Sequence, residues 1–249
     1  MKGEGLIENK ERLLTTNQIN LDTWKFIEKV HEPDEFESLQ FETSITLDEE
    51  EKKRYFIRYP TPIAIADSFP YYVSYEIGEG GNIVSIRYEI DEISQIPRAI
   101  THLEHLKDLD LEIRGKPVFP DFITNISRLQ SLRIWGTNES DYADFPLRIP
   151  SSVAKLQNLE RLDLGDSHVH KLPNDICTLS KLREMNLSKN QIRALPENFG
   201  NLTQLRSIDL SENMLTTLPR SIMQLKQLEY LELSRNNFRW IPYWIGDLK

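Results

Sequence analysis

The chain holds few side chains whose type and spacing would support catalysis. Its one cysteine, Cys177, has no catalytic triad in view, so we interpret it as an inert structural thiol. The sequence also lacks the glycine-rich phosphate loop, the G-x-S-x-G nucleophile turn, the H-E-x-x-H zinc helix and the C-x-x-C thiol pair. We therefore predict that the chain is not an enzyme and uses no cofactor.

The histidines are the remaining candidates for chemistry. His102 and His105 are three residues apart, and His168 and His170 lie close to Asp166. A metal site needs three or four ligands that converge on one point. Each cluster offers too few ligands, so we predict surface histidines and no metal.

The composition indicates which class of partner and which cellular compartment suit the protein. The formal net charge is −9, which argues against nucleic-acid binding because phosphates require a basic face. No stretch approaches the roughly 20 apolar residues of a membrane helix, and residues 1–14 hold no apolar run typical of a secretory signal. A single cysteine suits a reducing compartment. We expect a cytoplasmic protein that binds no nucleic acid and no membrane, with a protein partner that carries basic groups.

An internal repeat dominates the sequence. Leucines recur every 23 residues, at Leu156, Leu179, Leu202, Leu225 and Leu248. The unit that begins at Leu179 continues with Leu182, Met185, Leu187, Asn190, Ile192, Leu195-Pro196 and Phe199. Apolar residues keep the same offsets further upstream. We count seven units, which start near Gly80, Leu103, Ile126, Leu156, Leu179, Leu202 and Leu225.

This pattern, LxxLxxLxLxxNxLxxLPxxIxx, resembles the leucine-rich-repeat family over about two-thirds of the chain. The Leu-Pro form is similar to that of bacterial, archaeal and plant intracellular Ras-group members. The resemblance implies an α/β horseshoe solenoid, with a concave parallel β-sheet, convex short helices or turns, and usually a protein-binding role.

Physical reasoning on the repeat points the same way. Each L-x-L core alternates with the period of a strand, and no unit can bury its leucines alone, so neighbours must stack. The proline after Leu195, Leu218 or Ile241 suits the start of a helical turn. Asparagines should satisfy buried backbone groups at the turn after each strand. Only the last three units have this asparagine, so we expect a less regular early half. In the last three units this position holds Asn190, Asn213 and Asn236. In the four earlier units it holds Asp91, Arg114, Thr137 and Ser167.

The two ends of the predicted solenoid differ in whether a capping segment covers the apolar core. Residues 71–77 alternate as a strand and precede a glycine-rich turn, so we predict an N-terminal strand cap and a solenoid over 71–249. Residues 1–70 are expected to form a helical or partly flexible arm, with helices over 23–30 and 48–56. No capping sequence follows the last unit. Its apolar row of Leu225, Leu228 and Leu231 should therefore lack a neighbour and favour self-association.

One unit is interrupted near residues 137–147. The inserted residues include Tyr142 and Phe145, which are candidates for partner contacts because insertions in solenoids project as loops. A tolerated loop that packs on its own scaffold is an equal alternative.

The leading hypothesis is a protein-interaction scaffold that binds a basic partner on an acidic concave face. The predicted contacts are outward-facing strand residues, namely the acids Asp108, Asp110, Asp163, Glu184, Asp209 and Glu232 with the aromatic anchors Trp135 and Tyr230. The acids could instead be solvated surface, some of them paired with neighbours, as Arg161 and Asp163 would be. The alternative function is the recognition domain of a larger signalling protein or enzyme, GTPase-linked or ligase-linked, whose catalytic part lies outside this chain.

Overall fold

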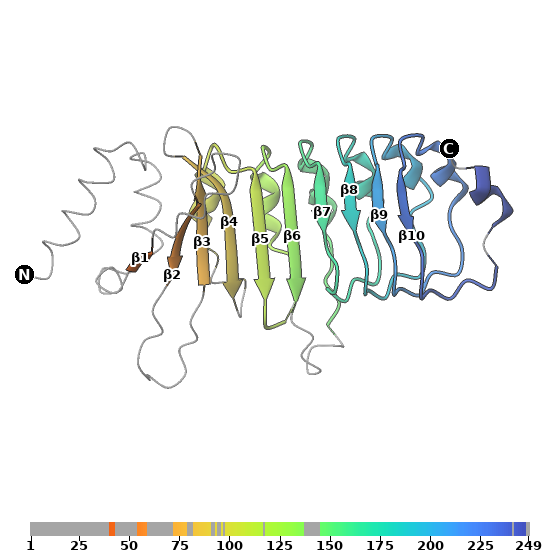
Figure 1. Ribbon diagram of the computed structural model, residues 1–249, viewed down its shortest axis with the longest axis horizontal. Helices are drawn as coiled ribbons and strands as arrows, with labels where there is room; N and C mark the ends of the chain where they lie inside the picture. The colour runs from red at the N-terminus through yellow and green to blue at the C-terminus, as the bar shows by residue number, and fades with distance from the viewer. Residues whose placement is uncertain are drawn as a thin grey trace, which may run out of the picture.

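The alternating apolar residues of each repeat form one strand of a continuous sheet in the computed structural model. The structure describes residues 40–42, 54–58, 72–78, 82–90, 93, 96, 98–116, 118–136, 145–240 and 242–247. Within these ranges, each of the seven predicted units contributes one parallel strand, side by side in chain order (Figure 1). The strands are β4 (Ile83–Ile90), β5 (Asp108–Ile113), β6 (Ser131–Gly136), β7 (Arg161–Asp163), β8 (Glu184–Asn186), β9 (Ser207–Asp209) and β10 (Tyr230–Glu232).

Short 3₁₀ turns form the second layer, behind the strands in Figure 1. Prolines open them as predicted: the carbonyls of Pro150, Pro173 and Pro219 accept the backbone N–H three residues later, at 3.1–3.2 Å. The described turns are η4 (Arg98–His102), η5 (Asp121–Asn125), η7 (Ser151–Lys155), η8 (Asn174–Thr178), η9 (Phe199–Asn201), η10 (Arg220–Gln224) and η11 (Tyr243–Asp247). The convex layer therefore consists of turns rather than long helices in the described part of the chain.

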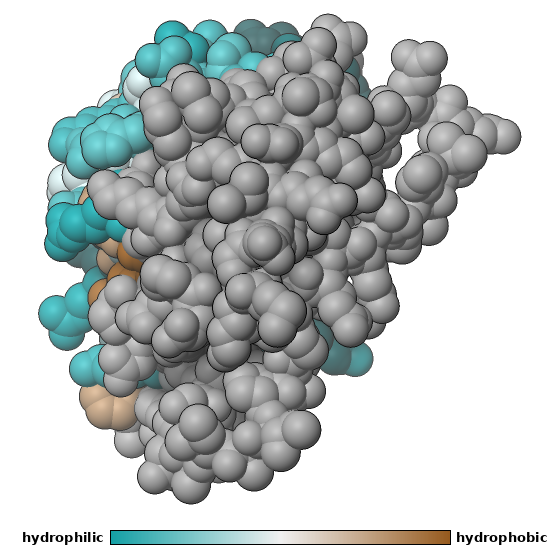
Figure 2. All heavy atoms as spheres, turned by 90° about the vertical axis from the view of Figure 1, so that its left-hand side faces the viewer, coloured by the Kyte–Doolittle hydropathy of each residue, from teal (hydrophilic) through white to brown (hydrophobic). Residues whose placement is uncertain are grey.

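The core lies between these layers. Leu162, Leu187 and Leu210 are almost completely buried, and their equivalents in the other units stack above and below them. The described atoms that are visible from the N-terminal side are mostly hydrophilic, with a smaller hydrophobic patch (Figure 2). Burial of one apolar column after another explains why the 23-residue phase must hold along the chain.

A ladder of buried asparagines connects the last units. The Asn190 Oδ1 accepts the N–H of Val169 at 2.8 Å, and its Nδ2 donates to the carbonyls of Leu164 and Leu187 at 2.8 and 2.9 Å. Asn213 and Asn236 repeat this arrangement. The predicted role of the asparagine column is confirmed.

The early half is built differently from the last four repeats. Strands β4 to β6 have six or eight residues, whereas β7 to β10 have three. In place of asparagine, the Ser167 hydroxyl donates to the Ile134 carbonyl at 2.8 Å, and Arg114 forms an ion pair with Glu89. Longer strands supply more ladder hydrogen bonds where the asparagines are missing.

The N-terminal edge of the sheet continues into antiparallel strands. The predicted cap strand is β3 (Tyr72–Ile77), which pairs with β4. Beyond it lie β2 (Arg54–Arg58) and β1 (Gln40–Glu42). The helix expected over 48–56 is wrong for residues 54–56, because aromatic and branched side chains favour a strand where β3 offers a free edge. The helix expected over 23–30 lies outside the described residues.

No helix within the described ranges combines the length and the apolar character needed to cross a membrane. The described helical segments are turns of three to five residues.

Candidate partner-binding surface

The side chains that alternate with the core leucines form the sheet face, which corresponds to the concave face expected from the sequence. Strand pairing aligns them in columns that run across the repeats. One column is Asp108, Ser131, Arg161, Glu184, Ser207 and Tyr230, and the next is Asp110, Arg133, Asp163, Asn186, Asp209 and Glu232. Trp135 lies on β6, opposite Glu112 of β5. The structure thus brings eight of the ten predicted site residues onto one face.

A hollow of about 400 Å³ crosses this face from β6 to β10. Four predicted residues line it, namely Asp163, Glu184, Asp209 and Tyr230. Tyr230 is 50% exposed at the β10 end, so its ring is available for contact. The hollow thus brings these four residues together on the sheet face.

The β4–β7 half of the face is a network of ion pairs. Arg87 reaches Glu112 at 3.0 Å and Asp110 at 3.8 Å, while Arg133 reaches Asp163 at 3.3 Å and Asp110 at 3.9 Å. Burial raises the pKa of Asp110, and Arg133, the Trp135 N–H and Arg87 partly offset that rise. The acids of this half therefore already have cationic partners.

Trp135 is also engaged within the network. Its indole N–H donates to the Asp110 carboxylate at 3.1 Å, and the Arg133 guanidinium lies 5.1 Å from the ring centroid. The pair that seemed natural in the sequence, Arg161 with Asp163, does not form. Arg161 instead contacts Glu184 at 3.3 Å on the next strand. Trp135 is thus half-buried and held in place by its neighbours.

The acids at the ends of β9 and β10 differ from those of the early half. In the described part of the chain, Asp209 and Glu232 form no ion pair, and their oxygens accept the backbone N–H of Ser211 and Ser234 at 2.8 Å. The Ser234 hydrogen bonds lower the pKa of Glu232. Desolvation first, and then the charges of Glu232 and Asp209, raise the pKa of the Tyr230 hydroxyl. This end is an acidic rim around an exposed aromatic ring.

These acids have a structural role that sequence reasoning missed. The side chain at the end of each of β7 to β10 accepts the N–H two residues later and so closes the following turn. The signal was present as a recurrent polar-Leu-small triplet, which is Asp163-Leu-Gly165, Asn186-Leu-Ser188, Asp209-Leu-Ser211 and Glu232-Leu-Ser234. The amide Asn186 serves as well as a carboxylate, so turn closure does not require a negative charge.

The remaining predicted residues belong to the insertion. Tyr142 lies outside the described residues. Phe145 is 39% exposed, and the Lys116 ammonium lies 4.3 Å from its ring centroid. Phe145 does not line the sheet-face hollow, so its role as a partner contact stays a prediction.

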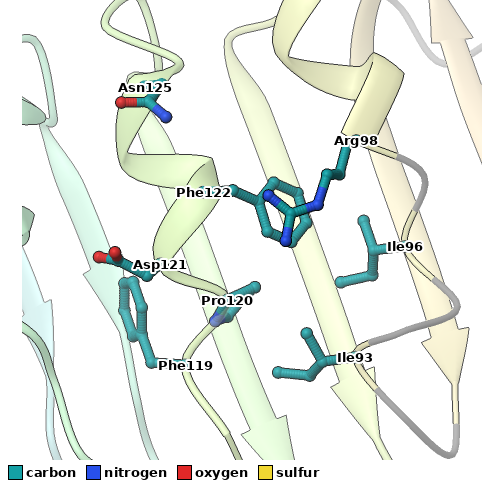
Figure 3. A pocket seen from close by; sticks show the side chains of 8 residues that line it. All are labelled: Ile93, Ile96, Arg98, Phe119, Pro120, Asp121, Phe122 and Asn125. Atoms are coloured by element: carbon teal, nitrogen blue, oxygen red, sulfur yellow. The ribbon is translucent and has the colours of Figure 1, made fainter.

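A second hollow, of about 570 Å³, lies on the turn side between η4 and η5 (Figure 3). Ile93, Ile96, Phe119 and Phe122 supply its apolar walls, and the Arg98 guanidinium lies 5.4 Å from the Phe122 ring centroid. No predicted site residue lines it. We interpret it as the gap between two successive turns.

Chemistry-bearing residues are sparse on the described surface. No group of three or more His, Cys, Asp or Glu side chains in the described ranges could hold a metal ion. Cys177 is 2% exposed, and burial, followed by the charge of Asp175, raises its thiol pKa to about 11. A buried thiol of this kind is a poor nucleophile.

The last repeat is only partly covered. Leu228 and Leu231 are half-buried, whereas the equivalent residues of the preceding unit, Leu205 and Ile208, are fully buried. The expectation that Leu225 would lack a neighbour is wrong, because Leu225 is 1% exposed and apolar side chains of η11 pack against the same core. Self-association through this end stays a prediction.

Comparison with known proteins agrees with the repeat architecture. Residues 174–249 match the family model described as a leucine-rich repeat region. No curated protein is significantly similar in sequence. An internalin from Listeria monocytogenes is 25% identical, with a TM-score of 0.50 over 66% of this chain and 44% of the internalin chain.

Two further solved structures are similar. The PEPR1–AtPEP1 structure is 22% identical, with a TM-score of 0.52 over 65% of this chain and 23% of that one. A leucine-rich-repeat protein of Leptospira interrogans is 24% identical, with a TM-score of 0.47 over 61% of this chain and 43% of that one. The chain spans less than half the length of these three structures. The stacked one-strand repeats, the asparagine ladder and the matched family model agree, and the chain forms a leucine-rich-repeat solenoid.

Proposed function

We propose that the protein is a protein-interaction scaffold whose sheet face binds a partner with basic groups at the β9–β10 end of the hollow. The observation that carries this proposal is the combination of the exposed Tyr230 ring with Asp209 and Glu232, which have no cationic partner in the described part of the chain. An aromatic anchor beside uncompensated charge is typical of the few residues that dominate interface energy.

The size of the face fits such a role. Seven parallel strands about 4.8 Å apart give a strip about 30 Å wide, which can hold an interface of standard size. Charge is distributed unevenly along this strip. Because Arg87 and Arg133 neutralise the early acids, a basic side chain of the partner gains most near Asp209 and Glu232.

A random peptide library displayed on phage tests this proposal. We expect selection on the wild-type protein to enrich lysine- and arginine-containing peptides. The double variant Asp209→Asn with Tyr230→Ala should weaken their binding at least tenfold, by loss of a charge and of an anchor. The amide at position 209 keeps the turn closed, as Asn186 does in the preceding repeat.

Tyr243→Ala is the matched control, because Tyr243 is 86% exposed in the same repeat but belongs to η11 on the turn side. It should bind selected peptides like the wild type. Enrichment of acidic or uncharged peptides, or equal loss in both variants, would overturn the proposal.

The second candidate is a recognition domain within a longer protein. It is favoured by the observation that the matched region covers 44% of the internalin chain and 23% of the PEPR1 chain. The intact mass of the protein isolated from its own cells distinguishes the two candidates. A mass well above 29.2 kDa supports the longer protein, and a mass equal to it supports the scaffold.

A further inference from the structure

The segments between the asparagine ladder and the 3₁₀ turns lie side by side in register. The N–H groups of Gln191, Met214 and Asn237 donate to the carbonyls of residues Val169, Ile192 and Leu215 of the preceding unit, at 2.9–3.0 Å. Positions 23 residues apart therefore form columns along the molecule. One column holds residues 170, 193, 216 and 239, and the next holds 171, 194, 217 and 240.

Both columns are exposed. In three of the segments two neighbouring side chains face solvent between two buried ones, as Arg193 and Ala194 do between Ile192 and Leu195. In the last segment Arg239 and Trp240 are exposed beside the half-buried Phe238. None of the eight residues is acidic. They are His170, Lys171, Arg193, Ala194, Thr216, Thr217, Arg239 and Trp240, and Arg148 takes the place of Lys171 in the unit before. We call Arg148, Lys171, Arg193 and Arg239 the basic stripe.

The basic stripe differs from the arginines that precede the strands. In the part of the chain that the structure describes, its four side chains make no ion pair or hydrogen bond. By contrast, Arg183 and Arg206, which precede the strands, contact Glu160 and Glu229 at 3.7 and 3.6 Å. The stripe therefore presents positive charge that the described residues do not neutralise, on a protein whose net charge is −9.

Exposed aromatic rings lie at the C-terminal end of the basic stripe. Trp240 is 75% exposed and Tyr243 is 86% exposed. Among the described residues, the acids nearest in sequence to Lys171 and Arg193 are Asp175 and Glu197, which belong to the flanking turns and form no ion pair with these two cations. Arginine, tryptophan and tyrosine are the residues most enriched among the energetic centres of protein interfaces.

We propose that the basic stripe and Trp240 bind an acidic segment of a protein partner, at a site separate from the sheet face. The four cations of the basic stripe are interrupted by uncharged threonines, and the molecule as a whole is acidic. Both features favour a locally acidic polypeptide over a nucleic acid or an anionic membrane as the ligand. A dense polyanion would be repelled by the net charge of the whole molecule. The exposed aromatic rings at the end of the stripe can contact an apolar side chain of a polypeptide. The phosphate backbone of a nucleic acid has no such group. This inference does not depend on the proposed function of the sheet face.

The test is the binding of a fluorescent twelve-residue peptide that is rich in glutamate and contains one phenylalanine, measured by anisotropy at low salt. Lys171→Gln with Arg193→Gln should weaken binding about tenfold and reduce its salt dependence. The control, Arg183→Gln with Arg206→Gln, removes the same charge from paired arginines and should change binding less than about twofold. Trp240→Ala should weaken binding without altering the salt dependence.

Several results would overturn the proposal. One is equal loss in the stripe and control variants, because net charge would then explain the binding. A second is tighter binding of an oligothymidylate or of phosphatidylserine vesicles than of the peptide, and a third is no peptide binding at low salt. Unchanged peptide binding by the double variant of Asp209 and Tyr230 is expected, and its loss would place the acidic peptide on the sheet face instead.

Discussion

Replacement of Asn190 by alanine should be among the most destabilising single changes in the chain. Its amide lies in the buried ladder and contacts backbone groups of two repeats. The Leu187 carbonyl would keep a hydrogen bond after this replacement, because it also accepts from the Asn213 side chain at 2.8 Å. The groups left without a partner are the Val169 N–H and the Leu164 carbonyl, each bonded at 2.8 Å, and the Ser167 N–H, bonded more weakly at 3.3 Å.

The magnitude follows mainly from the two groups that are bonded at 2.8 Å. A buried polar group without a hydrogen bond costs about 1–3 kcal/mol. Two such groups, with the small cavity left by the amide, predict a loss of about 3–5 kcal/mol in the free energy of unfolding. Asn236→Ala should cost less, about 1–2 kcal/mol, because the last rung of the ladder is half-exposed and water can replace the amide.

Urea unfolding followed by circular dichroism measures these differences. Asn201→Ala is the control, since Asn201 is exposed on η9 and its replacement should change stability by less than about 0.5 kcal/mol. A cost for Asn190→Ala no larger than that of Asn201→Ala, or smaller than that of Asn236→Ala, would refute the ladder reasoning.

Four further outcomes are expected. The Tyr88 hydroxyl is buried without a hydrogen bond in the described part of the chain, so Tyr88→Phe should raise the unfolding free energy by about 1 kcal/mol in urea titrations. Cys177 should react with iodoacetamide at pH 8 only as fast as the protein unfolds, because its thiol is buried and its pKa is about 11. The lowered pKa of Glu232 stabilises the fold above pH 4.5, and this contribution is lost as the pH falls through the folded pKa. Glu232→Gln should therefore flatten the acid limb of stability against pH. Finally, sedimentation velocity should show concentration-dependent association that Leu231→Lys abolishes, and a strict monomer would exclude self-association at β10.

Periodicity made most of the solenoid predictable. The 23-residue phase placed the seven parallel strands, the turns after the prolines and the core columns, because burial forces every repeat to keep the same offsets. Alternation within each strand then identified the outward side chains, including Asp209 and Tyr230. The antiparallel strands β1 and β2 were not predicted, since they lie outside the repeat and their pairing depends on the edge that β3 offers.

Electrostatic pairing was harder to predict than position. A charged side chain on a parallel sheet has neighbours on two strands, and the sequence alone does not decide between them. Arg161 illustrates this, because it contacts Glu184 rather than the adjacent Asp163, which pairs with Arg133. The turn-closing role of Asp209 and Glu232 was visible only as a short recurrent triplet. Its meaning required the backbone conformation of the turn.

Photo-crosslinking of a selected basic peptide tests the central claim most directly. A photoreactive benzoyl-phenylalanine is placed at position 230 in one variant and at position 243 in another, so that the same repeat reports on its two sides. We predict that the peptide becomes crosslinked from position 230, beside Asp209 and Glu232, and not from position 243. Crosslinking from position 243 alone would contradict the assignment of the sheet face as the partner-binding surface.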